Sequence, residues 1–458
     1  MKPSETIPSP ERRSSRLATK MKNTPPSMPL AKKRKKKLKT DFLSLNNDTL
    51  DEICEWLPLK SLAAFGMTCK RINQVASNYF RRKHPANYVL LSSSNGKVQL
   101  HPKEQYVQCF SEQFHNIVFH GAEKNVLQYA ATTFKKIPLR RIGFFAADYL
   151  TEAHAKCIDG IIKKADIIEF TRCSSTGGLY EILKHCSNMK HLALKSFTEC
   201  KTHGHKHEWM LQQYPTLKHL HWDLCGKLPV ELINFFKNNP NVDSFYGTQA
   251  ILPFIRDHNI MLKTLVVKVS ADSTETVFDQ LRDLCDQNAV QSLFLMGDLK
   301  QVNSNLPMLN KLTGIYAIDM TTATILQSFS HIKLINTTIT ALTQATQLAH
   351  GLVNLEEAYL DVTFIDSIMP FIRFAPKLTK IFINNTASMR PGSKLSLSKL
   401  EKQRNKLANA TKLTVYLKEG AYLKIKNMSI GSNCSTVQIK PIEAHITNNV
   451  FIRTILDI

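Results

Sequence analysis

The one cluster of residue types that could bind a metal ion consists of the histidines and cysteines between residues 185 and 207. The stretch Cys200-Lys-Thr-His203-Gly-His205-Lys-His207 follows His185 and Cys186. Zinc needs four such ligands that converge in a tetrahedron, whereas alternating histidines on an extended segment point to opposite sides. We therefore interpret residues 200–207 as a surface loop and predict no metal site, with metal binding as the alternative.

The ten cysteines form no CxxC pair and lack the spacing of a small secreted domain, which predicts free thiols in a reducing compartment. No motif brings a histidine and an acid beside any of them, as an activated nucleophile requires. The sequence also lacks a phosphate-binding loop, a dinucleotide-binding fingerprint and a metalloprotease motif. We expect a binding protein that is not an enzyme and that uses no cofactor.

A frame of apolar residues at positions 1, 4 and 6 recurs along most of the chain and predicts the elements that carry these residues. The copies follow one another at about 24 residues per step, within the range of leucine-rich repeats. One of the less regular copies is Leu309, Leu312 and Gly314. The copies begin at Phe114, Leu139, Ala165, Met189, Leu217, Val242, Leu262, Val290, Leu309, Ile332, Leu355 and Leu378.

Each step also has an apolar helical turn and a polar or Pro-containing loop before the frame, as in "LKHCSNMKHLAL". The pattern therefore predicts helix, loop and strand in every step. Such steps stack into an α/β solenoid over residues 114–386, with a curved parallel sheet on the inner face and helices outside. Side chains on the inner strands are then our candidate substrate contacts, together with loop 200–207: His191, His219, His221, Lys263 and Lys380.

The segments on either side of residues 114–386 are predicted to close the solenoid. Residues 86–113 contain Asn95-Gly96 between two short apolar runs, which is typical of a β-hairpin. Residues 387–458 begin with a polar, basic stretch that we expect to be a loop or a helix. The later stretches "LTVYLKEGAYLKIK" and "STVQIKPIEAHI" are interpreted as terminal strands that cap the exposed end of the sheet.

Residues 41–85 predict three short helices. Leu50, Ile53, Cys54 and Leu57 have the i, i+3, i+4, i+7 spacing of one helical face. Pro58 cannot continue that helix but suits the start of the next one. A third helix repeats the same spacing from Ile72. About 40 residues are too few to be stable alone, so a packing partner is expected, either the rest of the chain or another protein.

The stretch "LSLNNDTLDEICEWLPLKSLAAFGMTCKRINQVASNYF", residues 43–80, resembles an F-box, the module by which substrate receptors of SCF ubiquitin ligases bind a Skp-family adaptor. The Leu57-Pro58-Leu59-Lys60-x-Leu62 turn and Cys69-Lys70-Arg71 are in register with that family, as are Leu50, Glu52, Ile53 and Val75. The sequence departs from the family where Asn46 replaces the usual proline and where Ile72 replaces a common aromatic residue. The repeats that follow are similar to the leucine-rich repeats of such receptors.

The resemblance implies a substrate-recognition subunit that joins a cullin scaffold through the adaptor, while its repeats bind a protein substrate. Ubiquitin is then transferred by other subunits, so this chain acts by proximity. The positions that the resemblance assigns to adaptor binding form an apolar, helix-in-groove type of contact. They are Leu45, Leu50, Ile53, Leu57, Pro58, Leu59 and Leu62.

The first 40 residues are rich in Pro, Ser, Thr and Lys and carry about half of the formal net charge of +23. Such a segment buries too little apolar surface to fold, so we predict a disordered basic tail. Its cationic run suits the acidic groove of an import receptor, and we expect the protein in the nucleus, the cytoplasm or both. The run consists of Lys32, Lys33, Arg34, Lys35, Lys36 and Lys37.

Two alternatives remain at this stage. A basic tail also suits nucleic acid, so a nuclear nucleic-acid or chromatin-binding protein that uses the tail alone is the second reading. The third is an F-box scaffold that binds the adaptor without directing degradation. No apolar run approaches the about 20 residues that a membrane span requires, so we expect no membrane partner.

Overall fold

The computed structural model describes residues 44–83, 88–102, 104–176, 179–199, 207–223, 229–270, 275–297, 309–317, 331–383, 396–427 and 435–442. The predicted import run and residues 200–206 of the histidine-rich loop lie outside these ranges. Within the described residues, no helix is both long and apolar enough to cross a membrane.

Three helices open the described chain, as the apolar spacing predicts. They are α1 (Asn47–Trp56), α2 (Leu59–Gly66) and α3 (Lys70–Lys83). Pro58 stands at the N-cap of α2 in an extended conformation, because its ring cannot continue α1. The exposed Arg71 side chain donates two hydrogen bonds to the Asn47 side-chain oxygen, at 3.2 and 3.0 Å, and so ties α3 to the start of α1.

The packing partner that these helices need is the beginning of the solenoid. On α3, Phe80 stacks on Phe110 with ring centroids 4.5 Å apart, and it meets Phe114 edge-on at 5.4 Å. Phe110 ends α4 (Glu104–Phe110), and Phe114 is the first residue of the first apolar frame. All three rings are buried. The three helices and the first repeat therefore share one core, which we call the Phe80–Phe110–Phe114 joint.

One sheet of 16 strands runs through the rest of the described chain. Neighbouring strands are parallel from β3 onward, and β1 and β2 form an antiparallel hairpin that corresponds to the one predicted at Asn95-Gly96. The strands are β1 (Tyr88–Ser94), β2 (Lys97–His101), β3 (Asn116–His120), β4 (Arg141–Phe145), β5 (Ile167–Thr171), β7 (His191–Lys195), β9 (His219–Asp223), β10 (Ser244–Thr248), β11 (Leu262–Val269), β12 (Val290–Gly297), β13 (Leu312–Ala317), β14 (Leu334–Ile339), β15 (Glu357–Val362), β16 (Lys380–Ile383), β17 (Leu413–Leu417) and β18 (Val437–Pro441).

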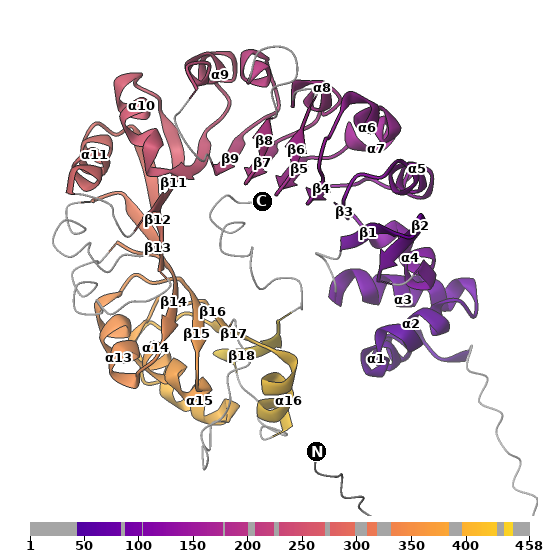
Figure 1. Cartoon of the computed structure of the whole chain (residues 1–458). Coiled ribbons are helices and arrows are strands. Elements are labelled where there is room, and N and C mark those ends of the chain that lie inside the picture. Colours follow the sequence, from indigo (N-terminus) through magenta and orange to yellow (C-terminus); the bar gives the residue numbers. More distant parts are fainter. Residues whose placement is uncertain are drawn as a thin grey trace, which may run out of the picture. The chain divides into compact units, whose positions relative to one another are not determined.

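Short helices connect these strands and lie on the outer side of the curved sheet (Figure 1). A second sheet of two very short strands, β6 (Ser174–Ser175) and β8 (Thr198–Glu199), lies beyond the ends of β5 and β7. The helices are α5 (Lys124–Thr133), α6 (Glu152–Cys157), α7 (Asp159–Ile162), α8 (Tyr180–Leu183), α9 (Leu232–Asn238), α10 (Leu252–Asp257), α11 (Glu275–Asp286), α13 (Leu342–Gly351), α14 (Met369–Phe374), α15 (Leu397–Arg404) and α16 (Glu419–Asn427), with the one-turn helices η2 (Ser111–Gln113), η3 (Glu208–Leu211), η4 (Gln249–Ile251) and η6 (Ile365–Ile368).

Each of the twelve apolar frames falls on one strand, from β3 to β16, and the predicted α/β solenoid is confirmed. Positions 4 and 6 of a frame point toward the helices and are buried, as Ile142 and Phe144 are. The residue between them points to the opposite, inner face, because successive side chains of a strand alternate. The sequence frame thus also tells which side chains line the inner face.

The frame predicted at Leu309, Leu312 and Gly314 is wrong by one residue at its last position. The register between β12 and β13 slips after Leu293, so that Phe294 pairs with Gly314 and Leu295 pairs with Ile315. Ile315, not Gly314, therefore takes position 6 on the helix side. Gly314 lies on the inner face, where a Cβ atom would come within 2.6 Å of the Phe294 ring. The bulge was not apparent from the apolar spacing alone.

The C-terminal segment also differs from the prediction. Strands β17 and β18 are present, but they extend the same parallel sheet. Residues Glu419–Asn427, predicted to be a strand, form helix α16. At this end, the buried Arg404 guanidinium donates to the carbonyls of Ala375, Pro376 and Leu378 at 2.7 to 2.8 Å. These bonds satisfy backbone groups that a repeat end leaves unpaired.

Candidate functional site

Apolar side chains are exposed where α1 ends and α2 begins. Trp56 is 83 % exposed, Pro58 is exposed, and Leu57 and Leu59 are half-buried. We call these four residues the junction surface. Met67, just after α2, is a further exposed apolar side chain at 60 %. Exposed Trp and Met side chains beside half-buried Leu side chains in one short segment are typical of a protein-binding surface.

Two of the seven residues assigned to adaptor binding lie in the core of the three helices and not on their surface. Leu50 and Leu62 are 0 % and 1 % exposed because they form the core among α1, α2 and α3. A side chain without exposed surface cannot contact a docked partner, so their role is corrected to core packing. Leu45 and Ile53 are half-buried.

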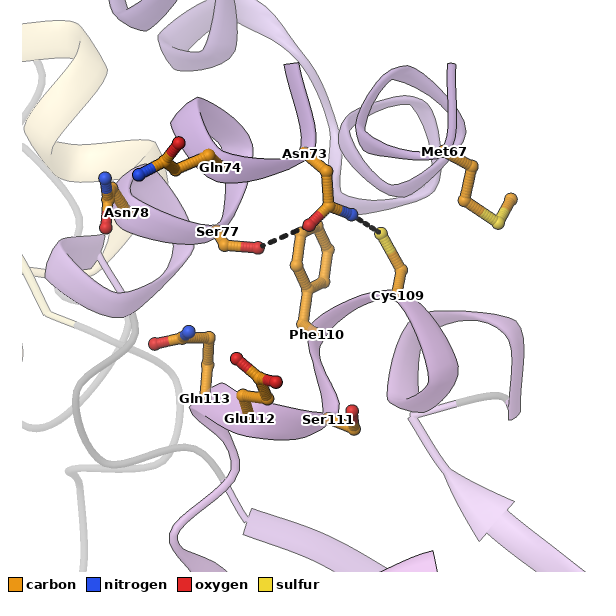
Figure 2. A pocket seen from close by; sticks show the side chains of 10 residues that line it. All are labelled: Met67, Asn73, Gln74, Ser77, Asn78, Cys109, Phe110, Ser111, Glu112 and Gln113. Atoms are coloured by element: carbon orange, nitrogen blue, oxygen red, sulfur yellow. Dashed lines mark hydrogen bonds between the residues drawn. The ribbon is translucent and has the colours of Figure 1, made fainter. Parts of the chain in front are cut away.

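A polar pocket lies between α3 and the segment formed by α4 and η2, with a volume of about 620 Å³. Figure 2 shows Asn73 at its wall, with its side-chain nitrogen 3.7 Å from the Cys109 sulfur and its oxygen 3.4 Å from the Ser77 hydroxyl. Burial raises the pKa of the Cys109 thiol, so this sulfur is protonated and a poor nucleophile at neutral pH. The lining residues are Met67, Asn73, Gln74, Ser77, Asn78, Cys109, Phe110, Ser111, Glu112 and Gln113.

The inner face of β4 to β9 carries a cluster of charged and titratable side chains. Arg141 on β4 forms an ion pair with Glu169 on β5, and both are largely buried. Next to them, the His191 and His219 rings have centroids 6.1 Å apart. On β9, His221 Nε2 is 3.7 Å from Asp223 Oδ2, which is too far for a good hydrogen bond. We call His191, His219, His221 and Asp223 the histidine cluster.

Burial dominates the ionisation of this cluster. It lowers the pKa of His191 to about 3 and that of His221 to about 4, although Glu169 and Asp223 oppose the shift. Burial by itself would raise the pKa of Glu169, but the positive charges of Arg141 and Lys195 lower it to about 2. At neutral pH the two histidines are therefore neutral, and Glu169 is ionised beside Arg141.

From β10 onward the inner face becomes apolar and aromatic. The Tyr359 and Phe382 rings stack at 4.6 Å, and Phe382 and Tyr416 stack at 4.3 Å. We call this set the aromatic row. Its members are Tyr246, Val266, Phe294, Met296, Tyr316, Leu334, Tyr359, Phe382 and Tyr416.

The five candidate substrate contacts have unlike environments. Lys263 is exposed and His219 is half-buried. The Lys380 ammonium donates to the Glu357 carboxylate at 2.7 Å, so its charge is compensated within the sheet. His191 and His221 lie on the inner face as predicted, but each is only 2 % exposed. The expectation that these two histidines are open to a partner is therefore corrected, because the structure buries both side chains.

Trp56 and Met67 were not among the residues assigned to adaptor binding, and the aromatic row was not predicted. The aromatic row had a signal: its tyrosines and phenylalanines mostly stand between positions 4 and 6 of successive frames, at Tyr246, Phe294, Tyr359 and Phe382. Large aromatic residues at positions that alternation places away from the helices indicate a functional face. Trp56 belongs to an excess of apolar residues within residues 41–85, but helical periodicity does not tell an exposed aromatic side chain from a partly packed one.

Among the residues that the structure describes, no group of three or more His, Cys, Asp or Glu side chains is arranged to hold a metal ion. His207 is the one member of the predicted histidine-rich loop 200–207 within this part of the chain. The metal alternative for that loop thus lies mostly outside the described residues.

Comparison with known families agrees with the N-terminal helices. The F-box domain model matches residues 42–83, the segment that contains α1, α2, α3 and the junction surface. F-box domains generally bind Skp-family adaptors. A comparison with curated proteins found no match for the chain.

Among solved structures, the crystal structure of a TLR13–ssRNA13 complex is similar at 13 % sequence identity and a TM-score of 0.34. The likeness covers 73 % of this chain and 54 % of that chain, so this chain spans about half of its length. The strand order and the register of the sheet define the solenoid. Residues 42–83 are an F-box domain, and a repeat solenoid with a parallel inner sheet follows it.

Proposed function

We propose that this chain is the substrate-recognition subunit of an SCF-type ubiquitin ligase. In this proposal, the F-box binds a Skp-family adaptor and, through it, a cullin scaffold, and the solenoid binds a protein substrate. The observation that carries the proposal is the F-box match together with the junction surface, where Trp56 and Pro58 are exposed on the matched domain.

The junction surface carries apolar area that is in contact with water. A buried apolar side chain such as Leu or Trp contributes roughly 25 cal/mol per Å² on leaving water. The junction surface exposes such side chains on a domain of about 40 residues, which already needs the Phe80–Phe110–Phe114 joint for its own stability. A protein partner that covers Trp56, Leu57 and Leu59 removes this apolar area from water, as in other helix-in-groove contacts.

The joint also supports the proposed proximity mechanism. A receptor accelerates transfer by holding a substrate near the reactive subunit, so a fixed spacing between its two binding regions is useful. Because Phe80 packs on Phe110 and Phe114 within one core, direct packing joins the F-box to the first repeat. No bond is made or broken by this chain in the proposal.

The basic tail fits the same proposal as a signal for nuclear import. Residues Lys32 to Lys37 lie outside the described residues, and their role rests on the cationic run itself. Nucleic-acid binding by the tail remains the competing reading; it predicts strong salt dependence and loss on deletion of residues 1–40.

A pull-down with purified adaptor tests the proposed function. Leu57→Asp with Leu59→Asp places two charges on the junction surface without touching the core residues Leu50 and Leu62, and we expect it to abolish adaptor binding. The matched control is Leu342→Asp with Leu423→Asp, two exposed leucines on α13 and α16, which should leave adaptor binding unchanged. Equal binding by both double variants would refute the proposed interface.

A ubiquitination readout distinguishes a receptor from a scaffold. The reconstituted ligase should modify proteins that co-purify with the solenoid, and the Leu57→Asp, Leu59→Asp variant should not support this transfer. Adaptor binding without any modification of co-purified proteins would favour the scaffold alternative.

A further inference from the structure

The turns that follow β4, β5 and β7 have an unusual backbone conformation. Most of the described residues with a positive φ angle are Gly, Asn or His, which tolerate this left-handed region best. The exceptions are Ala146, Tyr149, Arg172 and Ser196, with φ angles of 49°, 57°, 54° and 51°. Because β4, β5 and β7 are neighbouring parallel strands, these exceptions all lie at one edge of the sheet.

The first position of these turns requires a left-handed residue. Gly121 occupies this position after β3, with a φ angle of 81°, and the N–H groups of Gly121 and Ala146 both donate to a carbonyl of the next strand at 3.0 Å. Glycine meets this requirement at the lowest cost, whereas a bulky L residue is strained there. Arg172 and Tyr149 are left-handed and bulky all the same. Such strain clusters at functional sites, which indicates that these two side chains have a role beyond the turn.

Four side chains at this edge form what we call the edge surface: His120, Phe145, Tyr149 and Arg172. The Arg172 guanidinium carbon lies 5.9 Å from the centre of the Phe145 ring, within the range of a cation–π contact. The His120 and Phe145 ring centroids are 5.4 Å apart. Phe145 is half-buried, while the other three side chains are exposed, Tyr149 at 65 %. Tyr and Arg are among the residue types that dominate protein-binding surfaces.

Hydrogen bonds hold the two turns that carry Tyr149 and Arg172 side by side. The Tyr149 N–H donates to the Ser174 hydroxyl at 3.1 Å, and the Leu150 N–H donates to the Ser174 carbonyl at 2.9 Å. In return, the Ser174 N–H donates to the Ala147 carbonyl at 3.0 Å. A partner therefore meets Tyr149 and Arg172 on a fixed backbone, so that less conformational entropy is lost on binding.

The Arg172 guanidinium is available to a partner. Within the described part of the chain, it has no hydrogen-bond or ion-pair partner. Its contact with Phe145 occupies one face of the guanidinium and leaves the in-plane N–H donors free, and these match the two oxygens of a carboxylate. The acid in the adjoining turn, Asp148, accepts a hydrogen bond from the Ser174 hydroxyl at 3.4 Å instead. The edge surface thus combines an uncompensated positive charge with an exposed tyrosine.

We propose that the edge surface binds a protein segment that presents an Asp or Glu side chain to Arg172 and a neighbouring large apolar side chain to Tyr149 and Phe145. A nucleic-acid strand fits this surface less well, because it needs several cations along its backbone and because Asp148 repels phosphate groups. That the bound segment belongs to the substrate rests on the proposed function, whereas binding at the edge surface itself does not.

Fluorescence anisotropy with defined peptide pools tests the specificity. Pools of short labelled peptides, random except for a central pair fixed as Glu-Leu or Gln-Leu, are titrated with the full chain and with Arg172→Gly. Both chains carry the same basic tail, so the difference between them reports the edge surface alone. We expect the Glu-Leu pool to bind the unaltered chain at least about tenfold more tightly than the variant, a difference of about 1.4 kcal/mol. The uncharged Gln-Leu pool should bind both chains equally.

Labelled oligouridine is titrated in the same way and should also bind both chains equally. Equal affinity of the two chains for the Glu-Leu pool would overturn the proposal. A larger effect of Arg172→Gly on oligouridine than on the Glu-Leu pool would overturn it too, because the edge surface would then be a nucleic-acid site.

Substitutions by glycine separate the role of the side chains from that of the fold. Arg172→Gly and Tyr149→Gly keep the left-handed backbone and remove its strain. Both variants should therefore unfold at the same or a higher temperature than the unaltered chain, while each loses affinity for the Glu-Leu pool. Ala146→Gly is the matched control, because it makes the same backbone change without removing a contact side chain, and it should leave the affinity unchanged.

A lower unfolding temperature for Arg172→Gly and Tyr149→Gly would show that these side chains serve the fold, and an equal loss of affinity for Ala146→Gly would assign the effect to the backbone. Either result would contradict the proposal. Adaptor binding should be the same for all three glycine variants, and Leu57→Asp with Leu59→Asp should leave peptide binding intact. Failure at the edge surface and failure of the proposed function are therefore distinguishable.

Discussion

The junction surface of the F-box and the aromatic row of the solenoid consist of similar side chains but differ in exposure. Trp56 is 83 % exposed, whereas Tyr359 and Val266 are nearly inaccessible. When an outside partner covers an apolar surface that is in contact with water, the free energy of the system falls. When the chain itself buries an apolar surface, the same decrease in free energy stabilises the fold. The comparison therefore separates an apolar surface that is exposed to solvent from one that is buried within the described chain.

The strongest test of this difference places the same charge on both surfaces. Val266→Asp buries a carboxylate without a partner in the aromatic row, and we expect it to lower the free energy of unfolding by about 4 kcal/mol. Trp56→Asp should change it by less than about 1 kcal/mol, because a charge at an exposed site stays hydrated. Denaturant unfolding of both variants measures this. Similar losses for the two variants would show that the row is open to water.

The Phe80–Phe110–Phe114 joint tests how far the F-box depends on the solenoid. Phe110→Ala removes a ring that stacks on Phe80, and we expect a loss of about 3 kcal/mol from the cavity it leaves. Hydrogen exchange should then rise in α1 to α3 while β10 to β16 stay protected. Unchanged exchange in these helices would mean that the F-box is stable without the joint.

The histidine cluster predicts an acid-sensitive inner face. The pKa values of His191 and His221 are lowered to about 3 and about 4 in the folded chain, while an unfolded histidine titrates near about 6.5. The unfolded state therefore binds more protons as the pH falls below about 6.5, and stability decreases with falling pH. At pH 5, each histidine should cost about 2 kcal/mol relative to pH 7.

Unfolding measured between pH 7 and pH 5 checks this, with His221→Gln expected to reduce the slope. Glu169 has a pKa lowered to about 2, so its contribution is present above about 4.5 and is lost only below this window. An identical slope for His221→Gln and the unaltered chain would mean that His221 is accessible to protons in the folded state.

The smallest expected effect concerns a single side chain at the junction surface. Trp56→Ala should weaken adaptor binding about tenfold, or about 1.4 kcal/mol, because exposed aromatic anchors often dominate an interface. Stability should stay within about 0.5 kcal/mol. Isothermal titration with purified adaptor gives the affinity, and Leu423→Ala on α16 is the control. An unchanged affinity would place the contact on Leu57 to Leu59 without Trp56.

Local pattern was enough to predict most of the fold. The frames from Phe114 to Leu378 identify the strands β3 to β16, because a buried position in a solenoid recurs whenever a repeat recurs. The prediction was wrong where register depends on a neighbour. The register slips by one residue before Gly314, and the Phe294 ring occupies the space that a side chain at this position would need. Helix α16 was missed because its alternating apolar residues fit a strand as well as a helix.

The sequence by itself determined the F-box and the repeating strand frame, because both consist of residue types at short, regular spacing. Only the tertiary structure decided which apolar and polar side chains are accessible. Leu50 and Trp56 stand six positions apart on one helix, yet one lies in the core and the other in water. His191 and His221 lie on the predicted face but are buried. Exposure is set by what packs over a residue from elsewhere in the chain, and a local pattern contains no record of that.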